Sequence, residues 1–199
     1  ALLKQTIDSI NPQIVLHLAA QPLVRHSYQF PLETYSVNVM GTANLLQAAL
    51  DNGNVKGFVN VTTDKCYENK EWLWGYRENE PMGGHDPYSS SKGCAELVTA
   101  AYRKSFFNEN NSAFLASARA GNVIGGGDWS DHRIIPDFIR AIEARTKMEL
   151  RHPEATRPWQ FVLEPVSAYL RLGQMLLTSA EIHGEAYNFG PGYANSITV

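Results

Sequence analysis

The feature that most constrains the fold of this chain is the alternation of short apolar runs with segments of helical periodicity. Residues 13–20 form a nearly continuous apolar run, and residues 57–63 form a second one. Such runs are typical of strands buried on both faces of a parallel sheet, because a half-exposed strand would alternate apolar and polar residues. Between them, apolar residues recur at three- and four-residue steps over residues 33–50, which predicts a helix with one face toward the core.

The same alternation continues along the rest of the chain. We expect further strands at residues 113–119, 159–162 and 185–189, and further helices at residues 135–145 and 165–179. Strands and helices in alternation predict an α/β fold with a doubly wound parallel sheet, in which ligands bind beyond the carboxyl ends of the strands. The polar residues Thr62, Thr63 and Asp64 follow such an end and are candidates for a site.

A long irregular segment, residues 64–86, separates the second strand from the next helix. The segment is polar and aromatic and follows neither helical nor strand periodicity, so we predict a functional loop. Pro87 then suits the first turn of a helix, and Asp86 suits its cap. Tyr88 and Lys92 follow four residues apart, which places their side chains on one face of this helix.

A tyrosine and a lysine one helical turn apart can act together as a base. A phenol has an ordinary pKa of about 10, and a nearby ammonium favours its phenolate form. We therefore predict that Lys92 lowers the pKa of Tyr88 toward the range useful for proton abstraction. Many helices hold this pair by chance, but its position after a strand that ends in hydroxyl and charged groups favours a catalytic role.

Charge and composition exclude several classes of partner. A net charge of −3 and a pI near 6.1 leave no basic stripe for nucleic acid. No apolar run approaches the roughly 20 residues that a membrane-spanning helix needs. The histidines show no metal-ligand spacing, so we predict no metal site. We expect a cytoplasmic protein without nucleic-acid or membrane partners.

Several strings of the sequence resemble a known enzyme group. The run from Tyr88 to Lys92 resembles the active-site signature of the extended branch of the short-chain dehydrogenase/reductase superfamily, whose fold is Rossmann-like. The run from His17 to Gln21 resembles the cofactor-flanking strand end of that branch. Within the branch, the chain is similar to the CDP-glucose 4,6-dehydratases in four longer strings, residues 63–67, 71–77, 121–129 and 157–165.

This resemblance implies an enzyme with NAD as cofactor and CDP-glucose as substrate. Hydride leaves C4 of the glucose for NAD, water is eliminated across C5 and C6, and the hydride returns to C6. In this scheme Tyr88 takes the proton of the 4-hydroxyl, Lys92 assists it and holds the nicotinamide ribose, and Thr63 hydrogen-bonds the same hydroxyl. Asp64 protonates the departing 6-hydroxyl, which a partly desolvated site favours by raising the pKa of its carboxyl.

Lys65 stands where the related dTDP- and GDP-sugar dehydratases place a glutamate as the base for C5. An ammonium cannot accept a proton. Either Lys65 is neutral when substrate is bound, through burial and neighbouring positive charge, or it stabilises the C5 enolate while the proton passes through Tyr88 or water. A third possibility is that Lys65 is a solvated loop residue.

The resemblance also assigns binding residues. Arg133, Arg157 and Asn122 are expected to hold the substrate, because an arginine can fork two phosphate oxygens, although either arginine could instead lie on the surface. A homodimer and a role in the deoxysugars of bacterial surface polysaccharide are also implied. Cofactor contacts are expected from Ala19, Ala20, Gln21, Asn38, Thr62, Tyr88 and Lys92.

The domain organisation predicts a fragment. We expect residues 1–120 to form the central and later part of the NAD-binding Rossmann domain, and residues 121–199 to combine substrate-binding elements of a smaller C-terminal portion with returning strands. The glycine-rich fingerprint of a dinucleotide fold is absent from the chain, so we expect it to bind NAD poorly and to be inactive alone. Two other functions stay open, a sugar 4-epimerase or decarboxylase of the same superfamily and a non-catalytic nucleotide-sensing module.

Overall fold

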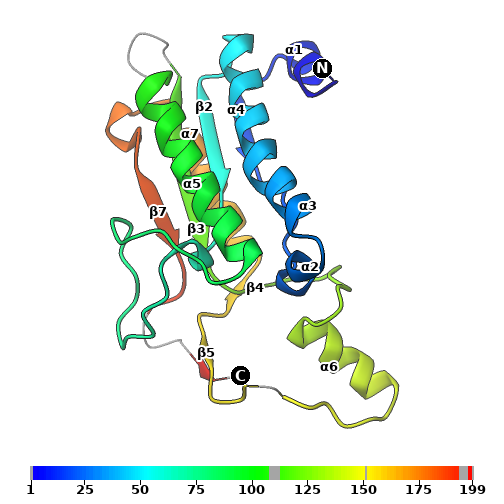
Figure 1. Cartoon of the computed structure of the whole chain (residues 1–199). Coiled ribbons are helices and arrows are strands. Elements are labelled where there is room, and N and C mark those ends of the chain that lie inside the picture. Colours follow the sequence, from blue (N-terminus) through cyan, green and yellow to red (C-terminus); the bar gives the residue numbers. More distant parts are fainter. Residues whose placement is uncertain (1, 108–112, 151, 193–196, 199) are drawn as a thin grey trace.

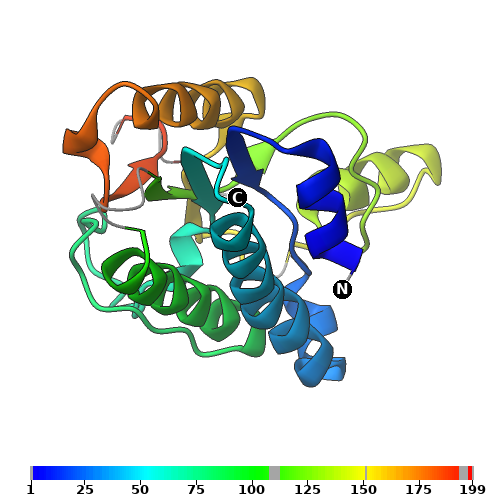
Figure 2. The same ribbon diagram turned by 90° about the horizontal axis from the view of Figure 1, so that it is seen from above.

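The computed structural model describes residues 2–107, 113–150, 152–192 and 197–198. Its centre is a parallel sheet in the order β1 (Ile14–His17), β2 (Gly57–Val61), β3 (Phe114–Ala120) and β7 (Ala186–Phe189). The helices α4 (Gly41–Asn52) and α5 (Pro87–Ser105) lie on one face of the sheet, and α7 (Leu163–Leu176) lies on the other (Figures 1 and 2). The predicted Rossmann-like, doubly wound α/β fold is confirmed.

The two faces of the sheet carry separate apolar cores, because successive side chains of a strand point to opposite sides. Phe58 and Leu115 belong to the core beneath α4 and α5, whereas their neighbours Val59 and Ala116 belong to the core beneath α7. All four side chains are fully buried. Each large one contributes about 1.5–3 kcal/mol by leaving water, which explains why the central strands are continuous apolar runs.

The carboxyl ends of β2 and β3 meet at one edge of the sheet. Their parallel register pairs Val61 with Ala118, and the Thr62 amide extends the pairing by donating to the Ala118 carbonyl at 2.8 Å. Beyond this edge β2 continues into the short helix η2 (Asp64–Cys66), and β3 continues into Gly121. A side chain at Gly121 would lie 2.8 Å from Pro158 and 3.4 Å from Asp64, so the close approach of these segments requires glycine.

The helix α5 begins where the sequence predicts. The Asp86 carboxylate accepts the Ser89 amide at 2.9 Å, and Pro87 occupies the first turn. Just before the cap, Gly84 has a φ of +132°, and a side chain there would lie 2.4 Å from the Ser90 amide nitrogen. The long loop is therefore folded against the first turn of α5 at a position that only glycine can occupy.

The helix predicted at residues 33–50 is longer and less regular than expected. It consists of α3 (Pro31–Tyr35), the π-helical segment η1 (Ser36–Met40) and α4, and it ends at Gly53, which has a φ of +71°. Asn38 lies in the π-helical segment. Its amide accepts the Gln21 backbone N–H at 2.8 Å and donates to the Gln21 carbonyl at 3.1 Å, so the helix fixes the loop that follows β1.

The remaining elements lie around the sheet. The prediction omitted α1 (Leu2–Ile10), α2 (Val24–Gln29) and the antiparallel pair of β5 (Thr156–Arg157) with β8 (Ile197–Thr198). The strand predicted at residues 159–162 shrinks to β6 (Gln160–Phe161), which pairs with β4 (Val123–Ile124). The helix α6 (Ile134–Glu143) stands away from the sheet (Figure 1), and η4 (Ala180–Ile182) precedes β7. In the described part of the chain, no helix is both long and apolar enough to span a bilayer.

Candidate active site

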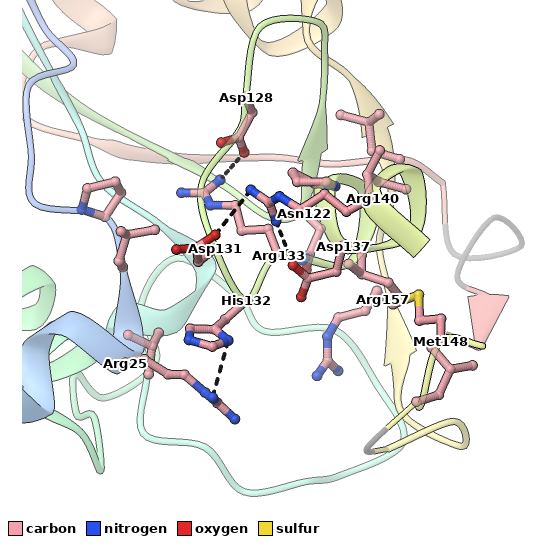
Figure 3. Close-up of a pocket in the computed structure, with 18 of the residues that line it drawn as sticks. Arg25, Asn122, Asp128, Asp131, His132, Arg133, Asp137, Arg140, Met148 and Arg157 are labelled. Carbon is pink, nitrogen blue, oxygen red and sulfur yellow. Dashed lines mark hydrogen bonds and ion pairs between the residues drawn. The ribbon is translucent and has the colours of Figure 1, made fainter. Parts of the chain in front are cut away.

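A cleft of about 1180 Å³ lies beyond the carboxyl ends of the central strands. One wall comes from the loop after β1 and from α2, and the other comes from segments between residues 121 and 159 (Figure 3). Six of the residues singled out in the sequence line this cleft, namely Thr63, Lys65, Tyr88, Asn122, Arg133 and Arg157. The fold thus brings together side chains from four separate segments of the chain.

Tyr88 is a buried phenol with an exposed fraction of 8%. Burial raises its pKa to about 12, although the hydrogen bond with Thr63 acts in the opposite direction. The charge of Asp64 raises the pKa further, and that of Arg133 lowers it. Lys92 is not among the main causes, so the prediction that Lys92 lowers the pKa of Tyr88 is wrong for this structure. Helical spacing reveals the shared face of the two side chains but not the loss of solvent around the phenol.

Lys92 is also buried, and its ammonium donates to the Val61 carbonyl at 3.4 Å. Burial lowers its pKa to about 8, while the negative charge of Glu96 raises it. An ammonium has three N–H donors, and within the described residues only this one contact uses them. Lys92 therefore has two donors available for a ligand beside the strand end.

Thr63, Asp64 and Tyr88 form a group of polar side chains. The Thr63 hydroxyl donates to the Asp64 carboxylate at 3.0 Å. Thr63 also lowers the pKa of the Tyr88 phenol, against the effect of burial. Phenol, hydroxyl and carboxylate thus lie together beside the end of β2.

Lys65 and Asp64 form an ion pair at 3.6 Å, and their side chains remain 42% and 38% exposed. The hypothesis that burial and neighbouring positive charge make Lys65 neutral finds no support in this geometry, because its partner is a carboxylate and water reaches it. The partial exposure of Asp64 likewise differs from the desolvated carboxyl that the sequence analysis expected. Two of the three alternatives fit this geometry, electrostatic stabilisation of the C5 enolate and a solvated loop residue.

Three of the predicted cofactor residues, Gln21, Asn38 and Thr62, are buried polar residues. Gln21 has a partner for each of its polar groups, since its amide bonds Thr34 and the Leu23 backbone and its own backbone bonds Asn38. The Thr62 hydroxyl donates a hydrogen bond to the Glu96 carboxylate. Ala19 and Ala20 follow β1 and carry only small side chains. In the described structure, Gln21, Asn38 and Thr62 are not among the residues that line the cleft, and they offer few unused polar groups to a ligand.

The residues expected to bind substrate differ in whether their polar groups already have partners. Asn122 has a buried side-chain oxygen without a hydrogen-bond partner among the described residues, and it lines the cleft. An unpartnered buried acceptor costs about 1–3 kcal/mol, which a donor from a ligand would restore. Among the described residues, the Arg157 guanidinium donates only to the neighbouring Thr156 carbonyl, at 2.7 Å. Arg133 is paired with Asp128 at 3.0 Å, so a ligand would compete for it (Figure 3).

Sequence reasoning missed several charged residues of the cleft. Arg140 is held by Asp131 at 3.2 Å and by Asp137 at 2.8 Å. Arg25 on α2 donates to the ring of His132 at 3.2 Å, across 107 residues of sequence, and has no carboxylate partner in the described ranges (Figure 3). The one sign in the sequence that Arg25 could belong to the site is its position shortly after β1. Across the described residues, no three His, Cys, Asp or Glu side chains are grouped as metal ligands.

Comparisons with known proteins agree with this geometry. The CDP-glucose 4,6-dehydratase of Salmonella typhimurium is 56% identical over 99% of this chain and 56% of its own length. The dTDP-D-glucose 4,6-dehydratase of Mus musculus is 31% identical over 92% of this chain and 48% of its own length. The solved structure of a dTDP-glucose 4,6-dehydratase from Bacillus anthracis in complex with NAD is 26% identical, with a TM-score of 0.79, and the match covers 99% of this chain and 56% of that chain.

The chain thus spans about half the length of the curated relatives it matches. The family model for GDP-mannose 4,6 dehydratase matches residues 1–190. This match includes the whole parallel sheet, the strand-end residues Thr63 and Asp64, and the helix that carries Tyr88 and Lys92. The chain belongs to the GDP-mannose 4,6 dehydratase family.

Proposed function

We propose that this protein is an NAD-dependent 4,6-dehydratase that converts CDP-glucose to CDP-4-dehydro-6-deoxyglucose. The observation that carries the proposal is the grouping of Tyr88, Thr63 and Asp64 at the edge of the cleft, where Thr63 donates to the Asp64 carboxylate at 3.0 Å and lowers the pKa of the phenol. An epimerase or decarboxylase needs the tyrosine and lysine but has no departing hydroxyl to protonate. The identity of 56% to a CDP-glucose 4,6-dehydratase supports the choice of substrate.

In this proposal the residues transfer protons at two positions of the sugar. When bound, NAD would supply a reversible acceptor for the hydride that moves from C4 to C6. Tyr88 takes the proton of the 4-hydroxyl, and Asp64 delivers a proton to the departing 6-hydroxyl, which leaves as water. After each turnover Tyr88 holds a proton that Asp64 lacks. Exchange of these protons with water resets the two groups.

Lys65 and Lys92 supply positive charge on the two sides of the reacting sugar. The C5 proton leaves to water during elimination, and a proton returns to C5 when hydride reaches C6. Lys65, as an ammonium, stabilises the negative charge of the C5 enolate in between, in keeping with its exposure and its ion pair with Asp64. Lys92 holds the nicotinamide ribose with the two donors it has free in the described structure. Ala19 and Ala20, which carry small side chains after β1, are expected to contact the cofactor.

The substrate diphosphate is expected between arginines of the two walls. Arg157 and Arg25 have no carboxylate partner within the described ranges, whereas Arg133 becomes available only when it leaves Asp128. Asn122 accepts a hydroxyl of the sugar with its unpartnered oxygen. Residues 1–120 would thus supply the cofactor side and residues 121–199 most of the substrate side.

Further proposals concern the protein outside the cleft. Because the 199 residues contain no glycine-rich fingerprint, they bind NAD poorly and are inactive by themselves. The active enzyme is a cytoplasmic homodimer. Its product feeds the synthesis of deoxysugars for bacterial surface polysaccharide, including O-antigen.

The proposal is tested with the variant Asp64→Asn of the whole protein, incubated with NAD and CDP-glucose. We expect C4 oxidation to persist, while elimination slows at least about 100-fold, because the acid that protonates the departing hydroxyl is lost. NADH absorbance and mass spectrometry of quenched samples would then reveal reduced cofactor and a 4-keto sugar that retains its 6-hydroxyl. The control Asp131→Asn removes another carboxylate that lines the cleft, and it should leave elimination unchanged. Normal elimination by Asp64→Asn would contradict the proposal.

A further inference from the structure

A buried ion pair lies behind the cleft, between α5 and β3. Arg119 donates two parallel hydrogen bonds to the Glu96 carboxylate, from Nε at 3.0 Å and from the terminal nitrogen at 2.9 Å. The side chains are only 6% and 5% exposed. Removing two charges from water costs several kcal/mol per ion, so a buried ion pair is weak support for stability by itself. The contacts of this pair indicate what else it does.

Glu96 connects two elements that carry reacting groups. It lies one helical turn after Lys92, on the same face of α5. The same carboxylate accepts a hydrogen bond from the hydroxyl of Thr62, the residue that precedes Thr63 at the end of β2. One carboxylate therefore holds the strand end against the helix of Tyr88 and Lys92.

Arg119 connects the same carboxylate to the long loop. One of its terminal nitrogens donates to the Tyr67 hydroxyl at 2.7 Å and to the Glu78 carbonyl at 2.9 Å. The Tyr67 hydroxyl in turn donates to Asn188 of β7 at 2.7 Å. The guanidinium thus uses all three of its nitrogens, and it fixes both Glu96 and two points of the loop that begins at Asp64.

We propose that Glu96, oriented by Arg119, is a positioning residue that holds the strand end of Thr62 and Thr63 in register with the helix of Tyr88 and Lys92. The inference rests on the proposed function, since it gives the pair a role in the proposed reaction. A pair that only joined α5 to β3 would not need the contact with Thr62 or those with the loop.

The charge of Glu96 has a second consequence for Lys92. Burial lowers the pKa of Lys92 to about 8, and Glu96 is the larger of the two influences that raise it. The other is Cys66, whose own pKa is raised to about 12 by burial, so this thiol is uncharged at neutral pH. Glu96 therefore keeps Lys92 an ammonium in the pH range where the enzyme would need it.

The test replaces the carboxylate by an amide in the whole protein. Glu96→Gln keeps the size of the side chain and an oxygen for the Thr62 hydroxyl, but it removes the charge. The reactivity of the Lys92 amine toward acetic anhydride is followed against pH by mass spectrometry, which requires neither substrate nor turnover. We expect the titration of Lys92 to shift to lower pH. A fall of one unit from about 8 raises the reactive fraction at pH 7 about fivefold.

A matched control separates this effect from simple loss of a buried contact. Thr99 lies on the same face of α5 and accepts a hydrogen bond from Asn60 of β2 at 2.7 Å, with an exposed fraction of 1%. Thr99→Val removes this bond between the same two elements without changing any charge. We expect it to lower stability and to leave the titration of Lys92 unchanged. If Glu96→Gln gives the same Lys92 titration as Thr99→Val, the inference is wrong.

A second variant covers the case in which Glu96→Gln does not fold. Arg119→Lys keeps the positive charge but loses the fork that orients the carboxylate. We expect the titration of Lys92 to stay near that of the parent, while kcat for C4 oxidation falls about tenfold with little change in KM. An unchanged kcat would overturn the positioning role. If the parent itself does not oxidise CDP-glucose, the proposed function fails, and the Lys92 titration still tests the electrostatic part of the inference.

Discussion

At the scale of single residues, His17 shows how burial and hydrogen bonding fix a protonation state. The Thr42 hydroxyl donates to the Asn38 carbonyl at 2.7 Å, so it must accept the N–H of the His17 ring nitrogen that lies 3.1 Å away. Burial and the nearby charge of Lys92 lower the pKa of His17 to about 4. The ring is therefore neutral near neutral pH, with its proton on Nε2.

His17→Gln tests this assignment, because glutamine can still donate to Thr42 but does not titrate. The unfolded chain binds a proton at the ordinary pKa of 6.5, and the native state does so only at about 4. Falling pH therefore favours unfolding of the parent across this window, by about 3 kcal/mol in total. Urea unfolding at pH 7.5 and pH 4.5 should show a larger loss for the parent than for His17→Gln. Equal losses would contradict the buried, neutral imidazole.

The sequence predicted which residue types meet at the site, but it did not predict their electrostatic states. Spacing placed Tyr88 and Lys92 on one helix face, as the structure has them. Their pKa values depend on how much solvent the tertiary structure removes, and burial moves both in the direction that disfavours the charged form. No local sequence pattern encodes that burial. The raised pKa of Tyr88 therefore could not be predicted from the spacing of the two residues.

At the scale of elements, the junction between the long loop and α5 determines where Tyr88 lies. Gly84 combines a positive φ with a backbone contact that leaves no room for a side chain. We expect Gly84→Ala to lower the free energy of unfolding by about 2–4 kcal/mol, since the strained backbone and the displaced first turn of α5 both add cost.

Gly75→Ala is the matched control for Gly84→Ala. Gly75 lies in the same loop, and a side chain there would meet nothing within 4 Å. Its effect on urea unfolding should be small. Equal effects of the two substitutions would show that the loop does not press on the start of α5.

Local patterns predicted the central elements and missed those that depend on distant partners. The apolar runs located β1, β2, β3 and β7, and the Asp86 and Pro87 signals located the start of α5. β5 and β8 contain two residues each and pair across about 40 positions, so neither has a local signal. α1 was recognisable, because Leu3, Ile7 and Ile10 recur at helical steps.

At the scale of the whole molecule, the cleft exists only because distant segments converge on one edge of the sheet. Parallel pairing brings Asp64 beside Gly121, and the contact of Arg25 with His132 connects the two walls. From the sequence we expected Arg133 and Arg157 to bind the substrate phosphates. The structure adds Arg25 as an arginine without a carboxylate partner in the described ranges. Ion pairs such as that of Arg133 with Asp128 depend on tertiary geometry, and a linear pattern does not reveal them.

The central claim is that one hydride leaves C4 of the sugar and returns to C6 of the same molecule. The most direct test incubates the whole protein with NAD and CDP-glucose that carries deuterium at C4, followed by NMR and mass spectrometry of the product. The account predicts a 4-keto-6-deoxy sugar that has lost water and carries the deuterium at C6. Deuterium that remains at C4, or a product that retains all of its hydroxyl groups, would contradict the assignment as a 4,6-dehydratase.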